Sequence, residues 1–237
     1  MGLQMSLDMN TATAVSYDTF HSPQPSFPAG AAAPAFQAIG TVAHFGPNET
    51  IFAEGDDARY AYKVVSGAVR ICKLLADGRR QIIEFAQDGD HFGFEWTNEY
   101  AVTAEALGPV TALRVPRARI ERLEREQQDV RNSLMQMLRR DLLSAQNHLL
   151  MLGRQTAKER VASFLLQMME RQDSGNSIDV PMSRQDIADY LGLTIETVCR
   201  ALSDLKRSCV ISIPNRHRIV VRNADVLETM ALGEDDA

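Results

Sequence analysis

The sequence predicts an α+β fold in three parts: an N-terminal β-roll, a long dimerisation helix and a C-terminal winged helix-turn-helix domain. Three observations predict these parts. Residues 37–116 contain short β-rich runs separated by Gly and Asp, residues 117–153 carry apolar residues at helical spacing, and residues 154–230 combine short helical patterns with a two-stranded ribbon. A flexible leader, residues 1–36, and an acidic tail, residues 231–237, complete the predicted organisation.

The composition indicates a chain that can bury a core and that carries its positive charge locally. Of the 237 residues, 45% are hydrophobic, and 25 Lys and Arg against 31 Asp and Glu give a net charge of -6. A chain this acidic is not expected to coat nucleic acid or a membrane uniformly. Residues 154–222, however, hold 11 Lys and Arg against 8 Asp and Glu. A basic surface is therefore predicted toward the C-terminal end.

The sequence contains no targeting, membrane-spanning or metal-binding signal. No stretch approaches the roughly 18 uninterrupted apolar residues of a spanning helix, and no Lys or Arg precedes Arg59, so a signal peptide would lack its positive region. Three cysteines, Cys72, Cys199 and Cys209, are too few and too scattered for a disulfide framework or a metal site. We expect a cytoplasmic protein with reduced thiols, no cofactor, no metal ion and no membrane partner, and with Cys72 and Cys209 in the core.

The leader and the β-rich region differ sharply in composition. The leader is rich in Ser, Thr, Ala and Pro, so it is expected to be flexible, either without function or as a segment that binds a partner. After it, five strands are expected, at 50–52, 60–65, 68–75, 80–85 and 110–115. Asp77-Gly78 is a hairpin signal because Gly tolerates the positive φ of a primed turn. Short strands with glycine corners indicate an all-β barrel or roll.

A helical pattern begins after Pro116 and continues for most of forty residues. Ile120 and Leu123 begin the apolar stripe. It continues through Val130, Leu134, Leu138, Leu142, Ala145, Leu149 and Leu152. A helix of ~35 residues is ~50 Å long, which exceeds what a small roll can cover. We therefore predict a parallel or crossed homodimer along this stripe, the alternative being a helix folded back on its own roll.

Residues 154–230 have the pattern of a helix-turn-helix followed by a wing. Helices are expected at 156–170, 184–190 and 195–208, with a strand at 178–182. A ribbon of 210–213 and 218–221 follows, closed around Pro214-Asn215-Arg216-His217. Ser183 with Asp186 resembles a capping box, Gly192 supplies a positive φ for the turn, and Thr194 caps the next helix. This arrangement is typical of DNA-binding domains.

The helix from Ile195 is predicted to present one face to the core and one outward. Val198, Ala201, Leu202 and Leu205 point to the core by periodicity, and the outward face carries Ile195, Glu196, Cys199, Arg200 and Ser203. In a major groove, Arg200 can donate to O6 and N7 of guanine, Glu196 can accept from a base amino group, and Ile195 can contact a thymine methyl. The alternative for Glu196 and Arg200 is an ordinary i,i+4 surface ion pair.

Further residues are expected at or near the DNA backbone, where contacts position a protein without specifying sequence. They are Ser183, Thr194, Thr197, Cys199, Ser203, Lys206, Arg207, Arg216, His217 and Arg218. Each of the basic ones could equally be a solvated charge. The expected nucleic-acid partner is double-stranded DNA with a palindromic site, because a dimer presents two recognition helices about one helical turn apart.

Several segments resemble the Crp/Fnr superfamily of transcription regulators over about residues 37–228. They are Phe52-Ala53-Glu54-Gly55-Asp56, residues 62–65, Ser66-Gly67-Ala68-Val69-Arg70, Gly89-Asp90-His91-Phe92-Gly93 and IADYLGLTIETVCR at 187–200. Within it, the chain looks most like the FixK-type regulators of microaerobic genes, because Ile195, Glu196 and Arg200 resemble the set used on TTGA/TCAA palindromes. An arginine at position 195 would indicate a TGTGA-type site. The resemblance implies a cyclic-nucleotide-binding-domain-like roll, transcription activation and contact with RNA polymerase.

The chain departs from the superfamily at both of its usual signal sites. Members that bind cyclic AMP hold its phosphate with an Arg-Ser pair, whereas residues 93–102 are shortened here, lack arginine and carry Glu99-Tyr100. Oxygen-sensing members need an N-terminal cysteine cluster, and no cysteine precedes Cys72. We therefore expect a regulator that binds DNA without an effector. Oxidation of Cys199 would add bulk and negative charge beside DNA, so this thiol is a candidate redox switch, with a tolerated small side chain as the alternative.

Two other classes of function compete with the DNA-binding regulator. In a ligand-responsive sensor, the roll would bind an unidentified small molecule with Phe94, Trp96 and Tyr100 lining the pocket, although these side chains could equally pack in the core or hinge. An enzyme is not expected, because the five histidines form no metal spacing and no nucleophile elbow or phosphate loop is present. No catalytic residue is therefore assigned.

Overall fold

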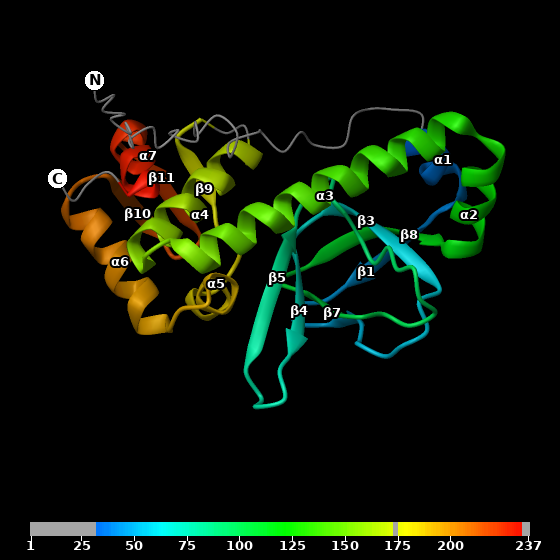
Figure 1. Ribbon diagram of the computed structural model, residues 1–237, viewed down its shortest axis with the longest axis horizontal. Coiled ribbons are helices and arrows are strands. Elements are labelled where there is room, and N and C mark those ends of the chain that lie inside the picture. The colour runs from blue at the N-terminus through cyan, green and yellow to red at the C-terminus, as the bar shows by residue number, and fades with distance from the viewer. Residues whose placement is uncertain (1–31, 173–174, 234–237) are drawn as a thin grey trace, which may run out of the picture.

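A computed structural model describes residues 32–172 and 175–233 of the chain (Figure 1). Most of the expected leader and of the acidic tail lies outside these residues. Residues 32–36, which the sequence pattern places in the leader, belong instead to helix α1, Ala32–Ile39. Phe36 is buried against Ala61 of the roll and Val130 of the long helix. Because of this apolar contact, regular structure begins at Ala32, several residues before the position expected from the composition.

The N-terminal domain is a β-roll of two four-stranded antiparallel sheets. One sheet has the order β1-β8-β3-β6 and the other β2-β7-β4-β5. The strands are β1 Thr41–Phe45, β2 Thr50–Phe52, β3 Tyr60–Ser66, β4 Val69–Leu74, β5 Arg80–Ala86, β6 His91–Phe92, β7 Thr103–Ala106 and β8 Val110–Pro116. All five expected strands are present, which confirms the roll. Strands β1, β6 and β7 were not expected; β6 has only two residues, and β7 contains only one β-branched residue.

Aromatic rings fill the interior of the roll. Phe52 stacks on Tyr100 with ring centroids 3.7 Å apart, and Tyr62 stacks on Phe92 at 5.1 Å. The Tyr100 hydroxyl donates to the carbonyl oxygen of Tyr60 at 2.6 Å, so the buried phenol has its partner. These four rings occupy the space between the sheets.

The predicted long helix is interrupted. Helix α2, Arg117–Glu126, ends at Gln127, whose backbone is extended, and helix α3, Gln128–Arg154, follows. The break falls within a polar run without apolar residues. It lets Ile120 and Leu123 of α2 pack in one cluster with Val130 and Leu134 of α3. The sequence pattern was therefore wrong about continuity, although α3 alone is still ~40 Å long.

The C-terminal domain is a winged helix-turn-helix, as predicted. It contains α4 Ala157–Gln172, β9 Ser177–Asp179, α5 Arg184–Leu191, α6 Ile195–Arg207, β10 Ile211–Asn215, β11 Arg218–Val221 and α7 Ala224–Leu232. The strands form a sheet of order β10-β11-β9, and α7 was not expected from the sequence. Among the described helices, none is long and apolar enough to cross a membrane.

The two domains share one apolar core. Cys72, Ile82 and Phe85 of the roll belong to the same buried cluster as the interior of the C-terminal domain. Cys72 is buried, as expected. Cys209 is exposed with a positive φ of 59°, so the expectation of a core cysteine was wrong there. It follows the last turn of α6, where the chain reverses toward β10.

Candidate nucleic-acid interface

Local hydrogen bonds define the two helices of the helix-turn-helix. The Ser183 Oγ accepts from the backbone N–H of Asp186 at 3.0 Å, and the Asp186 carboxylate accepts from the Ser183 N–H at 3.0 Å, which completes the predicted capping box of α5. Gly192 ends α5 with a φ of 62°. Thr194 caps α6 by accepting from the Thr197 N–H at 3.3 Å. The direction in which α6 leaves the turn is thus set by local chemistry.

The two faces of α6 are those that periodicity predicts. Val198, Ala201, Leu202 and Leu205 are buried. The opposite face is exposed and carries Ile195, Glu196, Cys199, Arg200 and Ser203. One apolar, one acidic and one guanidinium side chain therefore lie side by side on a rigid helix. Such a face can offer a methyl contact, an acceptor and a bidentate donor to base edges in a groove.

Glu196 is held as a charged acceptor and does not pair with Arg200. Hydrogen bonds from its own backbone N–H, and then from the Thr194 hydroxyl, lower the pKa of the Glu196 carboxyl. The i,i+4 ion pairs of the described residues join Arg117 to Glu121 and Arg122 to Glu126, and none joins Glu196 to Arg200. The alternative interpretation, an i,i+4 surface ion pair between Glu196 and Arg200, is therefore not found in the described structure. Both side chains remain available to an external partner.

Basic residues flank this face at the end of α6 and in the wing. Lys206 and Arg207 lie in the last turn of α6, where Arg207 pairs with Asp204 at 3.0 Å. In the wing, the Nε of Arg216 donates to Nε2 of His217 at 2.7 Å. The remaining exposed flanking positions are Ser183, Arg218 and His217. Arg218 also pairs with Asp179, at 3.1 Å, so its charge is partly compensated within the domain.

His217 fixes the wing to the body of the domain. Its Nδ1 lies 3.3 Å from the carbonyl oxygen of Val180. Because Nε2 accepts from Arg216, the ring proton belongs on Nδ1, from which it is donated to Val180. The imidazole therefore serves as a bridge that holds the Arg216 guanidinium at the wing.

One residue near this surface was not predicted from the sequence. Arg184, the first residue of α5, has a half-buried guanidinium whose Nη1 has no hydrogen-bond partner among the described residues. Burial lowers the pKa of Arg184, and the negative charge of a Cys199 thiolate would raise it. The guanidinium and the thiol are therefore electrostatic neighbours. Arg184 lies on α5 and Cys199 on α6, so no spacing rule within one helix could have indicated that they are close.

The apolar stripe of α3 divides into two halves. Val130 and Leu134 are buried within the same chain, so the prediction that they face a second subunit was wrong. Further along, Leu142 is 61% exposed and Leu149 is 74% exposed. Leu138 is half-buried and Ala145 is exposed. The half of the helix nearer the C-terminal domain thus carries an apolar face with no partner in the described chain.

The three aromatic residues considered as ligand contacts lie in different surroundings. Tyr100 is buried in the ring stack of the roll, and Phe94 packs against the cluster around Phe36. Trp96 is 78% exposed. Packing in the core is therefore confirmed for Tyr100 and Phe94, whereas Trp96 takes neither of the two expected roles.

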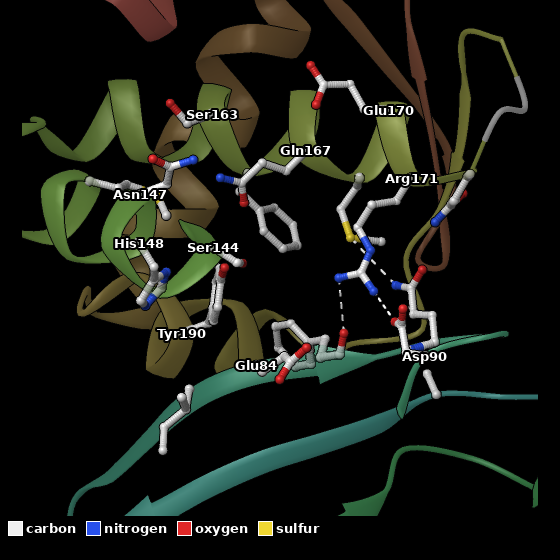
Figure 2. A pocket seen from close by; sticks show the side chains of 18 of the residues that line it. Glu84, Asp90, Ser144, Asn147, His148, Ser163, Gln167, Glu170, Arg171 and Tyr190 are labelled. Carbon is white, nitrogen blue, oxygen red and sulfur yellow. Dashed lines mark hydrogen bonds and ion pairs between the residues drawn. The ribbon is translucent and has the colours of Figure 1, made fainter. Parts of the chain in front are cut away.

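A cleft of about 1710 Å³ lies between the roll, α3, α4 and the wing (Figure 2). Arg171 in its wall already pairs with Asp90 and donates to the Phe85 carbonyl oxygen. Glu84 of β5 lines the same cleft and is exposed to solvent. Burial lowers the pKa of His148 to about 4, so this ring is neutral at pH 7. The exposed stripe of α3 borders the same cleft.

Comparison with known protein families identifies both domains. Residues 159–230 match the Crp-like helix-turn-helix domain. Residues 42–127 match the cyclic nucleotide-binding domain. The two matches agree with the winged domain and the β-roll of the structure.

Similar proteins cover most of the chain. The nitrogen fixation regulation protein FixK of Azorhizobium caulinodans is 43% identical over 198 residues, which are 81% of this chain and 80% of that protein. The protein of the same name from Rhizobium meliloti is 41% identical over 189 residues, 80% of this chain and 86% of its own length. The solved structure of FixK2 from Bradyrhizobium japonicum superposes with a TM-score of 0.79 at 42% identity, covering 81% of this chain and 97% of that one.

Proposed function

We propose that this chain, which belongs to the Crp/Fnr superfamily of transcription regulators, is a FixK-like activator that binds palindromic DNA as a homodimer without an effector. The observation that carries the proposal is the exposed face of α6. There Ile195, Glu196 and Arg200 stand on a capped helix inside a matched helix-turn-helix domain. Its similar proteins are named regulators of nitrogen fixation, and the proposed targets are microaerobic or anaerobic genes with TTGA/TCAA-type palindromes.

The free half of α3 supports a homodimer. Leu142 and Leu149 are separated by seven residues, and Leu138 and Ala145 are offset from them by the three or four residues of a coiled-coil seam. Burying both exposed leucines against a second copy would contribute about 1.5–3 kcal/mol for each side chain. A dimer formed along this seam would present two copies of α6 to one palindrome, ~34 Å apart.

The interior of the roll supports binding without an effector. The stacked rings of Phe52, Tyr62, Phe92 and Tyr100 occupy the space between the sheets. Glu99 stands in the segment where related proteins hold a phosphate, and a carboxylate there would repel an anion. The proposed regulator therefore depends on its synthesis, degradation or modification, and it activates transcription through contact with RNA polymerase.

Transcription in vitro tests the activator assignment. Purified, reduced, ligand-free protein is added to RNA polymerase on a promoter with a TTGA/TCAA palindrome and on the same promoter with the palindrome scrambled. Activation on the first template alone is the expected result. Equal transcription from both templates at saturating protein would reject the assignment.

Oxidation of Cys199 is expected to switch DNA binding off. The thiol is exposed on the outward face of α6 beside Arg200, and the Arg184 guanidinium is its electrostatic neighbour. Sulfinic or sulfonic acid at this position would place an anion against DNA phosphates. We expect peroxide to lower the affinity of the wild-type protein at least about tenfold and to leave Cys199→Ser unchanged.

Cys209 provides the matched control for this prediction. It is also exposed, but it lies beyond the C-terminal end of α6. Cys209→Ser should keep the full peroxide sensitivity of the wild-type protein. If Cys199→Ser lost affinity under peroxide as readily as the wild type, oxidation would be acting elsewhere.

Neutralising Arg216 is expected to weaken binding to all DNA sequences alike. Its guanidinium is held at the wing by His217 and has no carboxylate partner among the described residues, so a phosphate can take that place. Arg216→Ala should lower the affinities for matched and unrelated duplexes by similar factors. The slope of log Kd against log salt should fall by about 1 per subunit. A loss confined to the matched palindrome would assign Arg216 to base recognition instead.

A further inference from the structure

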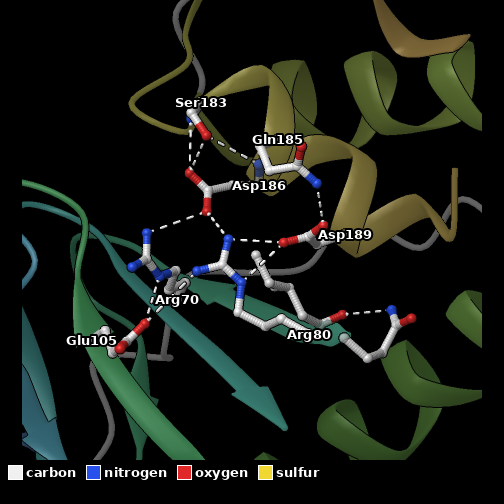
Figure 3. A network of polar contacts seen from close by, with 9 residues as sticks. Arg70, Arg80, Glu105, Ser183, Gln185, Asp186 and Asp189 are labelled. Carbon is white, nitrogen blue, oxygen red and sulfur yellow. Dashed lines mark hydrogen bonds and ion pairs between the residues drawn. The ribbon is translucent and has the colours of Figure 1, made fainter. Parts of the chain in front are cut away.

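The hairpin of β4 and β5 is joined to helix α5 by a network of ionic hydrogen bonds (Figure 3). The Oδ1 of Asp186 accepts from Arg70 Nη1 at 3.2 Å and from Arg80 Nη2 at 2.8 Å. The Oδ2 of Asp189 accepts from Arg80 Nε at 2.9 Å. On the roll side, Glu105 of β7 accepts from Arg70 Nε at 2.7 Å. We call these five residues the interdomain clamp.

The clamp is largely withdrawn from solvent. The Asp186 side chain is 5% exposed and the Arg70 side chain is 12% exposed. Charges in such surroundings are weakly screened by solvent and salt. Displacing one of these guanidinium or carboxylate groups from its partner therefore costs more free energy than in an exposed surface pair. Removing one member leaves its partners buried and incompletely paired, which is costly. The clamp therefore resists small changes in the relative orientation of roll and α5.

Asp186 links this clamp to the DNA-binding motif itself. One of its carboxylate oxygens, Oδ2, accepts from the N–H and hydroxyl of Ser183 and caps α5. The other, Oδ1, receives both guanidinium groups of the roll. Because α5 leads through Gly192 directly into α6, the roll holds the first helix of the motif at Asp186, the third residue of that helix and a member of its capping box.

Other contacts reinforce the same junction. Gln81 of β5 donates from Nε2 to the Tyr190 carbonyl oxygen at 3.3 Å, and the Phe85 and Tyr190 rings lie 5.2 Å apart. By contrast, the covalent connection from α3 to α4 passes through Gln155, whose backbone is extended. At this connection, Arg160 of α4 donates to the carbonyl oxygens of Leu152 and Leu191, each at 2.9 Å, and so ties the end of α3 to α5. Packing on the β4–β5 hairpin adds a second set of contacts, which hold α5 against the roll.

We propose that Arg70 and Arg80 are positioning residues for DNA binding, which set the separation of the two recognition helices in the dimer and so select the spacing of palindromic half-sites. This inference rests on the proposed DNA-binding function. Lengthening the spacer by one base pair moves the second half-site by ~3.4 Å and turns it by ~35°. A dimer with an intact interdomain clamp can bind the altered palindrome only if its DNA-binding domains turn relative to the rolls, which breaks clamp contacts. A dimer without these contacts can turn its DNA-binding domains at a lower cost in free energy.

The test compares Arg80→Gln with the matched control Arg79→Gln. Arg79 is the neighbouring residue, but its side chain is 78% exposed, and its ion pair within the described part of the chain is with Asp77 at the hairpin tip. Affinities are measured by fluorescence anisotropy on a single half-site, on the optimal palindrome and on palindromes with one base pair added or removed. For Arg80→Gln we expect an unchanged half-site affinity, about tenfold weaker binding to the optimal palindrome and at least about tenfold less discrimination between spacings. Arg79→Gln should behave as the wild type.

Two further variants keep the test decisive. Asp189→Asn removes a clamp carboxylate without touching the cap of α5, so it replaces Arg80→Gln if that variant does not fold. Arg80→Lys retains the charge and should restore part of the spacing preference. The proposal is overturned if Arg80→Gln weakens half-site and palindrome binding equally, or if the spacing preference stays that of the wild type. If the wild-type protein does not bind the palindrome more tightly than unrelated DNA, the proposed function itself is wrong, which is a different outcome from failure of the clamp proposal.

Discussion

Arg200→Ala is expected to remove most sequence-specific DNA binding while leaving the fold intact. The guanidinium is exposed on α6 and has no ion pair with Glu196 among the described residues, and we propose that it donates to a guanine. Loss of a bidentate base contact costs about 1–3 kcal/mol, so a dimer on a palindrome would lose about 2–6 kcal/mol, or at least about 30-fold in affinity. Because Arg200 packs in no core cluster of the described structure, thermal unfolding should be unchanged.

The measurement is a set of titrations on the matched palindrome and on duplexes substituted at the guanine of each half-site. Arg200→Ala should bind all of them with nearly the same affinity, since the discrimination at that position is lost. Arg222→Ala is the matched control, because its guanidinium donates to Ser212 within the wing sheet, at 3.1 Å. Equal losses on matched and substituted duplexes would show that Arg200 contacts phosphate and not a base.

Leu142→Glu combined with Leu149→Glu is expected to dissociate the proposed homodimer. Both leucines are largely exposed in the single chain, so the protomer should keep its fold. In the dimer, the change removes about 3–6 kcal/mol of apolar burial per chain and places like charges on the seam. The molecular mass measured by light scattering should fall from two chains to one. Affinity for the palindrome should fall at least about 100-fold, to that of a half-site.

The control for this variant adds the same charge elsewhere on the helix. Asn132→Glu combined with Gln136→Glu changes two exposed residues of α3 that lie off the Leu142–Leu149 stripe. This variant should remain a dimer with unchanged palindrome binding. A Leu142→Glu, Leu149→Glu protein that still had the mass of two chains would place the dimer interface on another surface.

The parts of the site that the sequence predicted are those determined by local chemistry. Capping by Ser183 and Thr194 and the positive φ of Gly192 depend on residues within one turn of each other. The buried and exposed faces of α6 follow from a period of 3.6 residues. Residue type and spacing alone therefore suffice to place the helix-turn-helix and its candidate base contacts.

The features that the sequence did not predict depend on contacts between distant segments. The clamp joins Arg70 to Asp186 across 116 positions, and no spacing rule connects them. Val130 and Leu149 both belong to the apolar stripe of α3, with the same helical spacing. This spacing could not predict that Val130 would be buried within the chain while Leu149 would be exposed. Likewise, the apolar partners of Phe36 come from the roll and α3, so composition alone assigned it to a flexible leader.

The central claim, an effector-independent FixK-like regulator, is tested most directly by one binding titration. Purified, reduced and ligand-free protein is titrated at fixed salt onto a TTGA/TCAA palindrome and onto a TGTGA/TCACA palindrome, with fluorescence anisotropy as the readout. Ile195, Glu196 and Arg200 on a preformed α6 predict tight binding to the first and at least about 100-fold weaker binding to the second. Weak binding to both duplexes would contradict the claim and would mean that a ligand or a modification is needed before α6 can engage DNA.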